Sequence, residues 1–156
     1  MEIAGLPAHP LIIHATVVLA PLAAVLVIVF AVWPRNRWLT RWPAAVGAVV
    51  AVIVVWAARL SGASMLEANP ALRQLVATHQ ERAELASLVV IGFTVLTLVG
   101  TWSLGGPTAL ASGRGERESR VVVLDKVMPA VLVVAAVAMI ASVVLAGDAG
   151  ARAVWG

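Results

Sequence analysis

The 156-residue sequence is 62% hydrophobic and 12% charged, with a mean hydropathy of +0.99, whereas soluble domains have about 25% charged residues. A soluble protein of this length cannot bury so much apolar surface, so the composition predicts an integral membrane protein whose partner is the lipid bilayer. The lack of cysteine excludes disulfides and zinc–thiolate sites, and the scattered cations behind the net charge of +3 form no nucleic-acid-binding stripe.

Four apolar segments are long enough to cross a bilayer, which takes about 20 residues of helix. These spans lie at about residues 10–33, 43–60, 83–104 and 124–147. The first is too long for a signal-peptide core and no Lys or Arg precedes it, so we expect it to be retained. The sequence predicts an all-α, four-helix up-down membrane bundle that forms one domain over residues 1–156. We detect no internal repeat.

Local signals predict where the helices begin and end. Gly62 is expected to end the second helix as its C-cap. Asn69-Pro70 is expected to open a short amphipathic helix of about two turns, between helices two and three, on the extracytoplasmic side. Thr78-His79-Gln80-Glu81 has the pattern of a capping box at the start of helix three.

The distribution of Lys and Arg predicts the orientation. The connections between helices one and two and between helices three and four hold seven of the eleven cations, and the opposite side holds four. The seven are Arg35, Arg37, Arg41, Arg114, Arg117, Arg120 and Lys126. Cytoplasmic loops carry the excess of Lys and Arg, so both termini are expected to be extracytoplasmic, in a bacterial plasma membrane.

This topology places all three histidines, His9, His14 and His79, at the extracytoplasmic end of the bundle. His14 lies about one and a half turns inside helix one, and a polar group at that depth is expected to face the bundle interior. It can be a ligand or proton carrier, or a packed, hydrogen-bonded histidine. His9 precedes Pro10 and is expected to lie just outside the helix. Five residues separate it from His14, which is about 140° around a helix.

Two further charged residues belong to the same end. Asp148 follows helix four and can balance an arginine or a metal, or can simply end the span. Arg59 follows helix two. The sequence has no phosphate-binding loop, nucleophile elbow or HExxH motif, so we assign no catalytic residue and favour a protein that is not an enzyme.

The sequence around the histidines resembles the bacterial membrane family known as domain of unknown function 2231, over nearly the whole chain. The residues that carry the resemblance are the run from Gly5 to His14 (GLPAHPLIIH), Ser61-Gly62, His79 and Gly147-Asp148-Ala149-Gly150-Ala151. Asp148 stands where many relatives have histidine, which excludes a four-histidine site. The resemblance implies a haem or metal membrane module, with His14 and His79 as ligands, alone or with His9.

Three functions remain open. The first is a b-type haem or transition-metal module for electron transfer, with His14 and His79 as ligands and with His9 and Arg59 as their supports or as partners of haem propionates. For a metal ion, the ligands would be His14, His79 and Asp148. The second is a non-catalytic accessory subunit of a membrane or redox complex. The third is a small-molecule permease. Whatever the function, we also expect that the chain can form a homo-oligomer.

Overall fold

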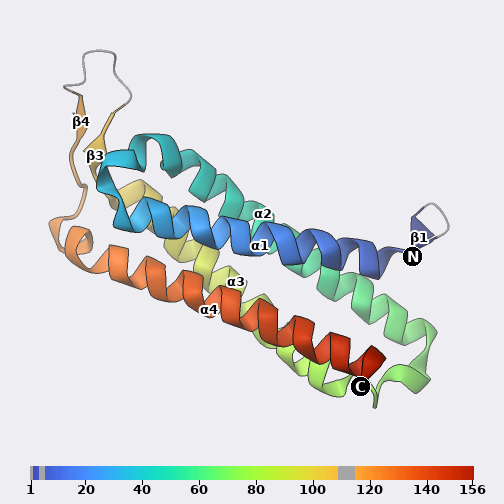
Figure 1. The fold of residues 1–156 in the computed structure, drawn as a ribbon. Helices are drawn as coiled ribbons and strands as arrows, with labels where there is room; N and C mark the ends of the chain where they lie inside the picture. Colours follow the sequence, from blue (N-terminus) through green and yellow to red (C-terminus); the bar gives the residue numbers. More distant parts are fainter. Residues whose placement is uncertain (1, 4–5, 109–114) are drawn as a thin grey trace.

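The computed structural model describes residues 2–3, 6–108 and 115–156, which contain four long helices (Figure 1). These are α1 (Ala8–Val32), α2 (Arg37–Ala68), α3 (Ala77–Ser103) and α4 (Val122–Trp155). Each of the four is long and apolar enough to cross a membrane. The chain is therefore an all-α four-helix bundle and a multi-pass membrane protein, as the sequence predicts.

Short elements precede or connect the long helices. They are β1 (Glu2–Ile3), β2 (Leu6–Pro7), η1 (Pro34–Asn36), η2 (Pro70–Leu72), β3 (Gly106–Pro107) and β4 (Glu116–Arg117). The strands form two antiparallel pairs, β1 with β2 and β3 with β4. The amphipathic helix expected between α2 and α3 is the 3-10 helix η2, which is shorter than the two turns expected.

Helices α2 and α4 continue beyond the ends expected from their apolar spans. Gly62 lies inside α2, which ends at Ala68, so its assignment as a C-cap is wrong. Helix α4 continues past residue 147 to Trp155. A glycine inside a helix costs only about 1 kcal/mol relative to alanine. Packing against another helix can offset that cost, so a glycine after an apolar run does not by itself end a helix.

Helix α3 begins earlier than the expected capping box. Its N-cap residue is Val76, and no side chain hydrogen-bonds to its first turn. The backbone N–H of Gln80 already donates to the Val76 carbonyl at 2.9 Å. The capping box at residues 78–81 is therefore wrong, because these residues lie inside the helix.

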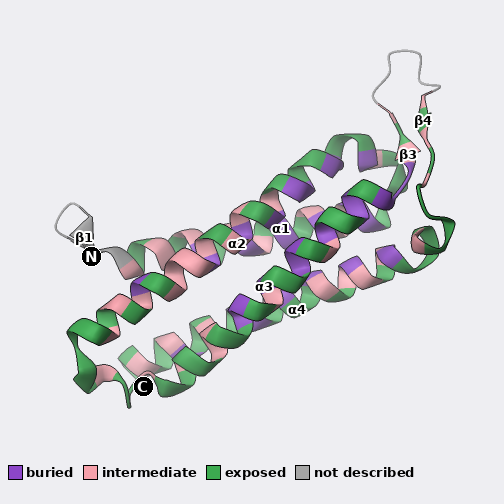
Figure 2. Ribbon diagram, turned by 180° about the vertical axis from the view of Figure 1, so that it is seen from behind, coloured by how far each residue is buried: buried purple, intermediate pink, exposed green. Residues whose placement is uncertain are grey.

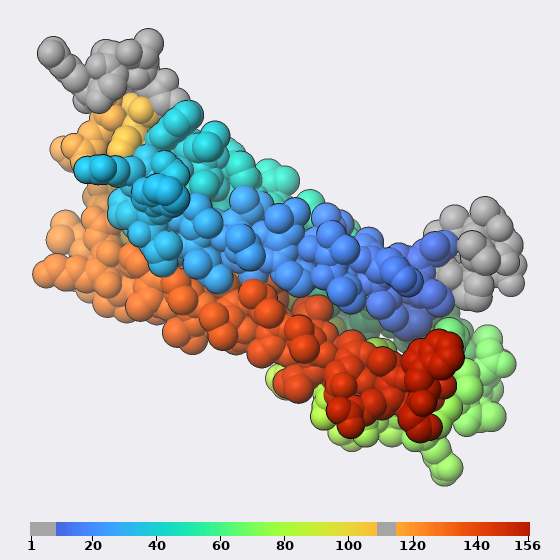
Figure 3. Space-filling model, viewed as in Figure 1, coloured from blue at the N-terminus to red at the C-terminus, as the bar shows by residue number. Residues whose placement is uncertain are grey.

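The helices pack around an alanine-rich core, with their exposed faces turned outward (Figure 2). Phe30, Phe93 and Leu132 are among the largest fully buried side chains. A methyl group on Gly47 of α2 would lie 3.4 Å from Cβ of Ala23 in α1. Small residues at such crossings let two helices approach closely. The space-filling view shows α1 and α4 lying side by side along the bundle (Figure 3).

The hairpins α1–α2 and α3–α4 repeat one burial pattern. Counted from His9 in α1 and from His79 in α3, the buried positions of α1 all have buried counterparts in α3. These pairs are Thr16/Ala86, Ala20/Val90, Ala23/Phe93, Ala24/Thr94, Val27/Thr97, Phe30/Gly100 and Ala31/Thr101. The two helices therefore present the same face to the bundle, starting from a histidine in each.

The second helices of the two hairpins, α2 and α4, also have buried residues at corresponding positions. Counted back from Gly62 in α2 and from Gly150 in α4, most buried positions again correspond. These pairs are Thr40/Met128, Ala44/Leu132, Ala48/Ala136, Ala51/Met139, Val55/Val143 and Ser61/Ala149. This correspondence lies in the spacing of the buried positions and not in the residues themselves. Few of the paired residues are identical, because a buried position needs an apolar or small side chain rather than a particular one.

Arg37 and Arg41 lie in the first turns of α2 and are buried, although the sequence placed them in a connecting loop. The connection η1 is so short that α2 begins at Arg37 itself. Both guanidinium groups lie over the ring of Phe30, at 5.7 and 5.5 Å from its centre. The two arginines therefore close this end of the bundle.

Candidate functional site

Two of the three histidines meet at the end of the bundle where α1 and α3 begin. The ring centres of His9 and His79 lie 6.5 Å apart, and the ring planes are at 71° to each other. His9 lies inside α1 and not before it, which corrects the expectation from sequence. The two histidines occupy corresponding positions of the repeated hairpins, so one site is built from both halves of the chain.

His9 is held by Ser61 of α2. Its Nδ1 lies 2.9 Å from Oγ of Ser61, and the same hydroxyl donates to the Ala58 carbonyl at 2.9 Å. The single hydroxyl proton is used in that second bond, so Ser61 accepts from the N–H at Nδ1 of His9. This assigns the proton of the neutral ring to Nδ1 and leaves a lone pair on Nε2.

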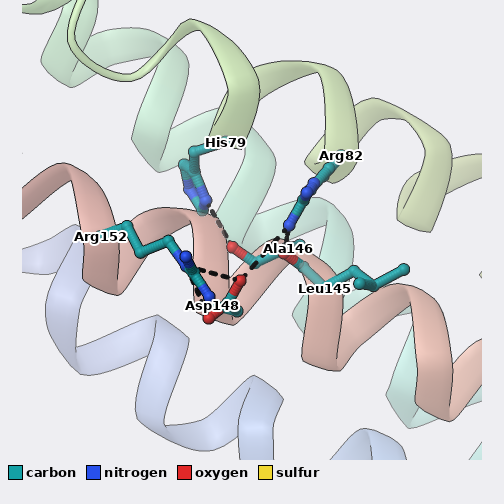
Figure 4. A network of polar contacts seen from close by, with 6 residues as sticks. All are labelled: His79, Arg82, Leu145, Ala146, Asp148 and Arg152. Atoms are coloured by element: carbon teal, nitrogen blue, oxygen red, sulfur yellow. Dashed lines mark hydrogen bonds and ion pairs between the residues drawn. The ribbon is translucent and has the colours of Figure 1, made fainter. Parts of the chain in front are cut away.

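His79 is held by α4 in the same way. Its Nδ1 lies 2.8 Å from the carbonyl oxygen of Ala146 (Figure 4). A carbonyl only accepts hydrogen bonds, so Nδ1 of His79 is the donor and Nε2 keeps its lone pair. A backbone carbonyl on the other ring nitrogen is the usual support of a metal-binding histidine. Both histidines of the pair therefore present Nε2 as a free ligand atom.

A glycine lies against each ring. A methyl group on Gly62 would lie 3.0 Å from Cε1 of His9, and one on Gly150 would lie 3.0 Å from Nδ1 of His79. Neither ring could keep its place beside an alanine without some shift. The two glycines thus let α2 and α4 close onto the imidazoles, which fixes the ring orientations.

Asp148 is engaged by arginines (Figure 4). Its carboxylate lies 3.1 Å from Nε of Arg152 and 3.6 Å from Arg82, whose guanidinium also donates to the Leu145 carbonyl at 2.9 Å. These contacts show Asp148 balancing arginines, which is one of the roles expected from the sequence. Asp148 also lies inside α4 and does not end the helix.

Arg59 lies beside a second acid of this end, Glu84. Its guanidinium is 3.7 Å from the carboxylate of Glu84 in α3 and lies over the ring of Trp56 at 5.2 Å. This contact joins α2 to α3. Both charged side chains are partly exposed, and such ion pairs contribute little to stability.

His14 does not belong to the pair. Its side chain is exposed, and its Nδ1 lies 2.7 Å from the Pro10 carbonyl of its own helix. The expectation that His14 faces the bundle interior is wrong. His9 and His14 are about 140° apart around α1, so only one of them can face inward, and that one is His9.

Over the described ranges, 2–3, 6–108 and 115–156, no three His, Asp or Glu side chains are grouped to hold a metal ion. The metal-ion set of His14, His79 and Asp148 is therefore not assembled. What the chain provides is a pair of imidazoles with fixed proton positions. Such a pair can supply two nitrogen ligands to one metal centre.

Several parts of this site have no strong signal in the sequence. A backbone carbonyl such as that of Ala146 gives no sequence signal, and although Ser61 and Gly150 belong to the residues that carry the family resemblance, their contacts with the histidines are not readable from it. Comparison with family models, with curated proteins and with solved structures gives no match to this chain.

Proposed function

We propose that this membrane protein holds a redox-active metal centre, as a b-type haem or a single transition-metal ion, between His9 and His79, and that it serves electron transfer. The observation that carries the proposal is the pair of imidazoles with ring centres 6.5 Å apart, each with Nδ1 bonded to a neighbouring helix and with no hydrogen-bond partner for Nε2 among the described residues. The resemblance to the family of unknown function 2231 belongs to the same proposal.

The separation of the rings fits a shared metal. His9 and His79 would hold the metal through Nε2, and metal–nitrogen bonds in proteins are about 2.0–2.1 Å long. The ring centres of His9 and His79 are 6.5 Å apart. The donor set therefore fits a haem iron or an ion that accepts two nitrogen ligands.

The surrounding residues would tune this centre. A bound metal would supply one-electron chemistry. Ser61 and the Ala146 carbonyl accept from the Nδ1 protons, which orients the rings and raises the basicity of Nε2. Arg59, the proposed partner of a haem propionate, lies close to Glu84 in an exposed and therefore weak ion pair.

Titration of the purified protein tests the proposal. Haemin and Cu⁺ are added separately, and binding is followed by visible absorption, pyridine haemochrome and metal analysis. We expect stoichiometric binding of one of the two, lost in His9→Ala and in His79→Ala and retained in the exposed control His14→Ala. A haemochrome spectrum assigns the centre to haem, and copper without haem assigns it to the ion. Binding of neither, or equal binding in all variants, would overturn the proposal.

We further propose that the histidine pair faces the outside of a bacterial plasma membrane, with both termini extracytoplasmic. Support comes from the excess of Lys and Arg at the opposite end of the bundle. Four exposed tryptophans at that end, Trp33, Trp38, Trp42 and Trp102, fit an interfacial belt. An electron donor or acceptor would then approach from the extracytoplasmic side.

A second candidate function is a non-catalytic accessory subunit of a membrane complex. The observation that favours it is that both Nδ1 bonds join neighbouring helices, α1 to α2 and α3 to α4, so the histidines can serve stability alone. Native mass spectrometry of the protein extracted in mild detergent tests this. A redox or membrane partner at fixed stoichiometry supports it, and a free monomer or homo-oligomer counts against it.

A further inference from the structure

The end of the bundle opposite the histidine pair holds four arginines around the last residues of α3. We name Arg37, Arg41, Arg117 and Arg120 the arginine cluster. Their side chains come from the start of α2, from β4 and from the segment before α4. Arg37 and Arg41 are distant in sequence from Arg117 and Arg120, and the fold brings the two pairs to the end of the bundle where α1 and α3 end (Figure 1).

Two members of the cluster are bound to the ends of helices. Arg41 donates to the carbonyls of Thr101 and, at 2.8 Å, Leu104. Arg37 donates to Gly105 at 3.0 Å and also to carbonyls in the last turn of α1. The last carbonyls of a helix lack intrahelical partners and carry partial negative charge, so both guanidinium groups are held firmly in place.

The other two members lie further out on the same helix end. Arg117 donates to the Trp102 carbonyl at 2.8 Å. The guanidinium of Arg120 lies 4.8 Å from the ring centre of Trp102, and its backbone N–H donates to Ser103. Arg120 is exposed and Arg117 is half-buried, so both can still reach a ligand.

The positive charge of the cluster is only partly balanced by the part of the chain that the structure describes, where Glu116, Glu118 and Asp125 are the nearby acids in sequence. No carboxylate there forms an ion pair with any of the four arginines. Asp125, which accepts a hydrogen bond from Ser119, acts electrostatically on Arg37 and offsets part of this charge without forming an ion pair. Backbone carbonyls supply only partial charges, so the cluster keeps a strong preference for an anion.

The level of the cluster in the membrane indicates which anion. Four exposed tryptophans belong to the same helix ends: Trp33 follows α1, Trp38 and Trp42 lie in the first turns of α2, and Trp102 lies in the last turn of α3. Exposed tryptophans mark the headgroup level of a bilayer. Basic groups at that level attract the phosphates of anionic lipids. We propose that the arginine cluster binds the phosphate of an anionic phospholipid, which Arg117 and Arg120 contact while Arg37 and Arg41 supply fixed positive charge.

Lipid retention measured by native mass spectrometry tests this site. The full-length protein is titrated in detergent with phosphatidylglycerol or, separately, with phosphatidylcholine of the same acyl chains. We expect the wild-type protein to bind phosphatidylglycerol more tightly than phosphatidylcholine. The affinity for phosphatidylglycerol should fall about fivefold for each arginine removed, first in Arg117→Gln and then in Arg117→Gln/Arg120→Gln. The matched control is Arg73→Gln/Arg152→Gln, which removes two cations from the opposite end and is expected to leave binding unchanged.

Each other outcome counts against the proposal. Equal binding of the two lipids by the wild-type protein overturns it without any variant, so loss of folding in a variant cannot hide the answer. An equal effect of the control pair would show a general charge effect. Displacement of phosphatidylglycerol by millimolar inorganic phosphate would assign the cluster to free phosphate instead of lipid.

Discussion

Gly100 of α3 lies so close to Leu132 of α4 that a methyl group on Gly100 would come within 2.8 Å of Cδ1 of Leu132. Leu132 is fully buried, so its side chain cannot swing away into lipid. We expect Gly100→Ala to destabilise the bundle by about 1–3 kcal/mol through overpacking. Thermal unfolding in detergent, followed by circular dichroism, measures the change.

Gly92 of the same helix is the matched control for this prediction. Nothing lies within 4 Å of a methyl group built on Gly92. Gly92→Ala is expected to leave stability unchanged or to raise it by up to about 1 kcal/mol, the helix-propensity difference. Equal destabilisation by both substitutions would show that α3 and α4 do not cross at Gly100.

Gly150 gives a prediction for the candidate site. A methyl group there would lie 3.0 Å from Nδ1 and 3.1 Å from Cε1 of His79, which would push the ring away from the Ala146 carbonyl. Because such supporting bonds are worth about 10–100-fold in metal affinity, we expect Gly150→Ala to weaken binding of haemin or Cu⁺ by about tenfold. The control is Gly147→Ala, which meets nothing within 4 Å. Equal affinity in the two variants would contradict the role of the ring position.

The buried arginines predict a large effect on stability. Arg41→Met removes a guanidinium that is bonded to the carbonyls of Thr101 and Leu104. Hydrogen bonds from charged groups contribute about 1.5–3 kcal/mol each, so we expect a loss of at least about 2 kcal/mol in unfolding free energy. Arg35 is exposed, and Arg35→Met is expected to change stability by less than about 0.5 kcal/mol. Similar values for both variants would argue against the closing role of Arg41.

The proposed orientation can be tested directly because the chain has no cysteine. Arg35→Cys and Thr78→Cys each introduce one exposed thiol, at opposite ends of the bundle. A thiol reagent that does not cross membranes is expected to label Thr78→Cys in intact cells and Arg35→Cys only after lysis. The reverse pattern would place the histidine pair in the cytoplasm.

The number of long helices is predictable from the sequence, and their ends are not. Each apolar run must match the thickness of the bilayer, so its minimum length is known and the runs can be counted in the sequence. The ends of α2 and α4 lie beyond those runs, where packing against other helices decides how far each helix continues. Gly62 stays helical although its residue type favours a helix end, and Arg37 enters the bundle although its charge predicts a loop. Both depend on contacts between segments that are far apart in the sequence.

Only part of the candidate site could be predicted from the sequence, because the side of a helix that faces inward depends on packing. His79 was correctly placed at the start of α3, but its neighbour is His9 and not His14. The depth of His14 in the span gave no information on which side of α1 it lies, and His9 was expected outside a helix that in fact begins at Ala8. The repeated burial pattern, counted from His9 and His79, resolves this choice, but it becomes visible only when burial is known for both hairpins.

A substitution of Asp148 distinguishes two ligand sets for the candidate site, His9 with His79 and Asp148 with His79. Its carboxylate lies between Arg82 and Arg152 at partly exposed positions, and such pairs contribute less than about 1 kcal/mol each. Asp148→Ala is therefore expected to lower stability only slightly and to leave binding of haemin or Cu⁺ unchanged, as measured by the same titration. His79→Ala, which removes a proposed ligand, is expected to abolish it. If Asp148→Ala lost the metal while His9→Ala kept it, the ligands would be Asp148 and His79, and the pairing of the two imidazoles would serve packing alone.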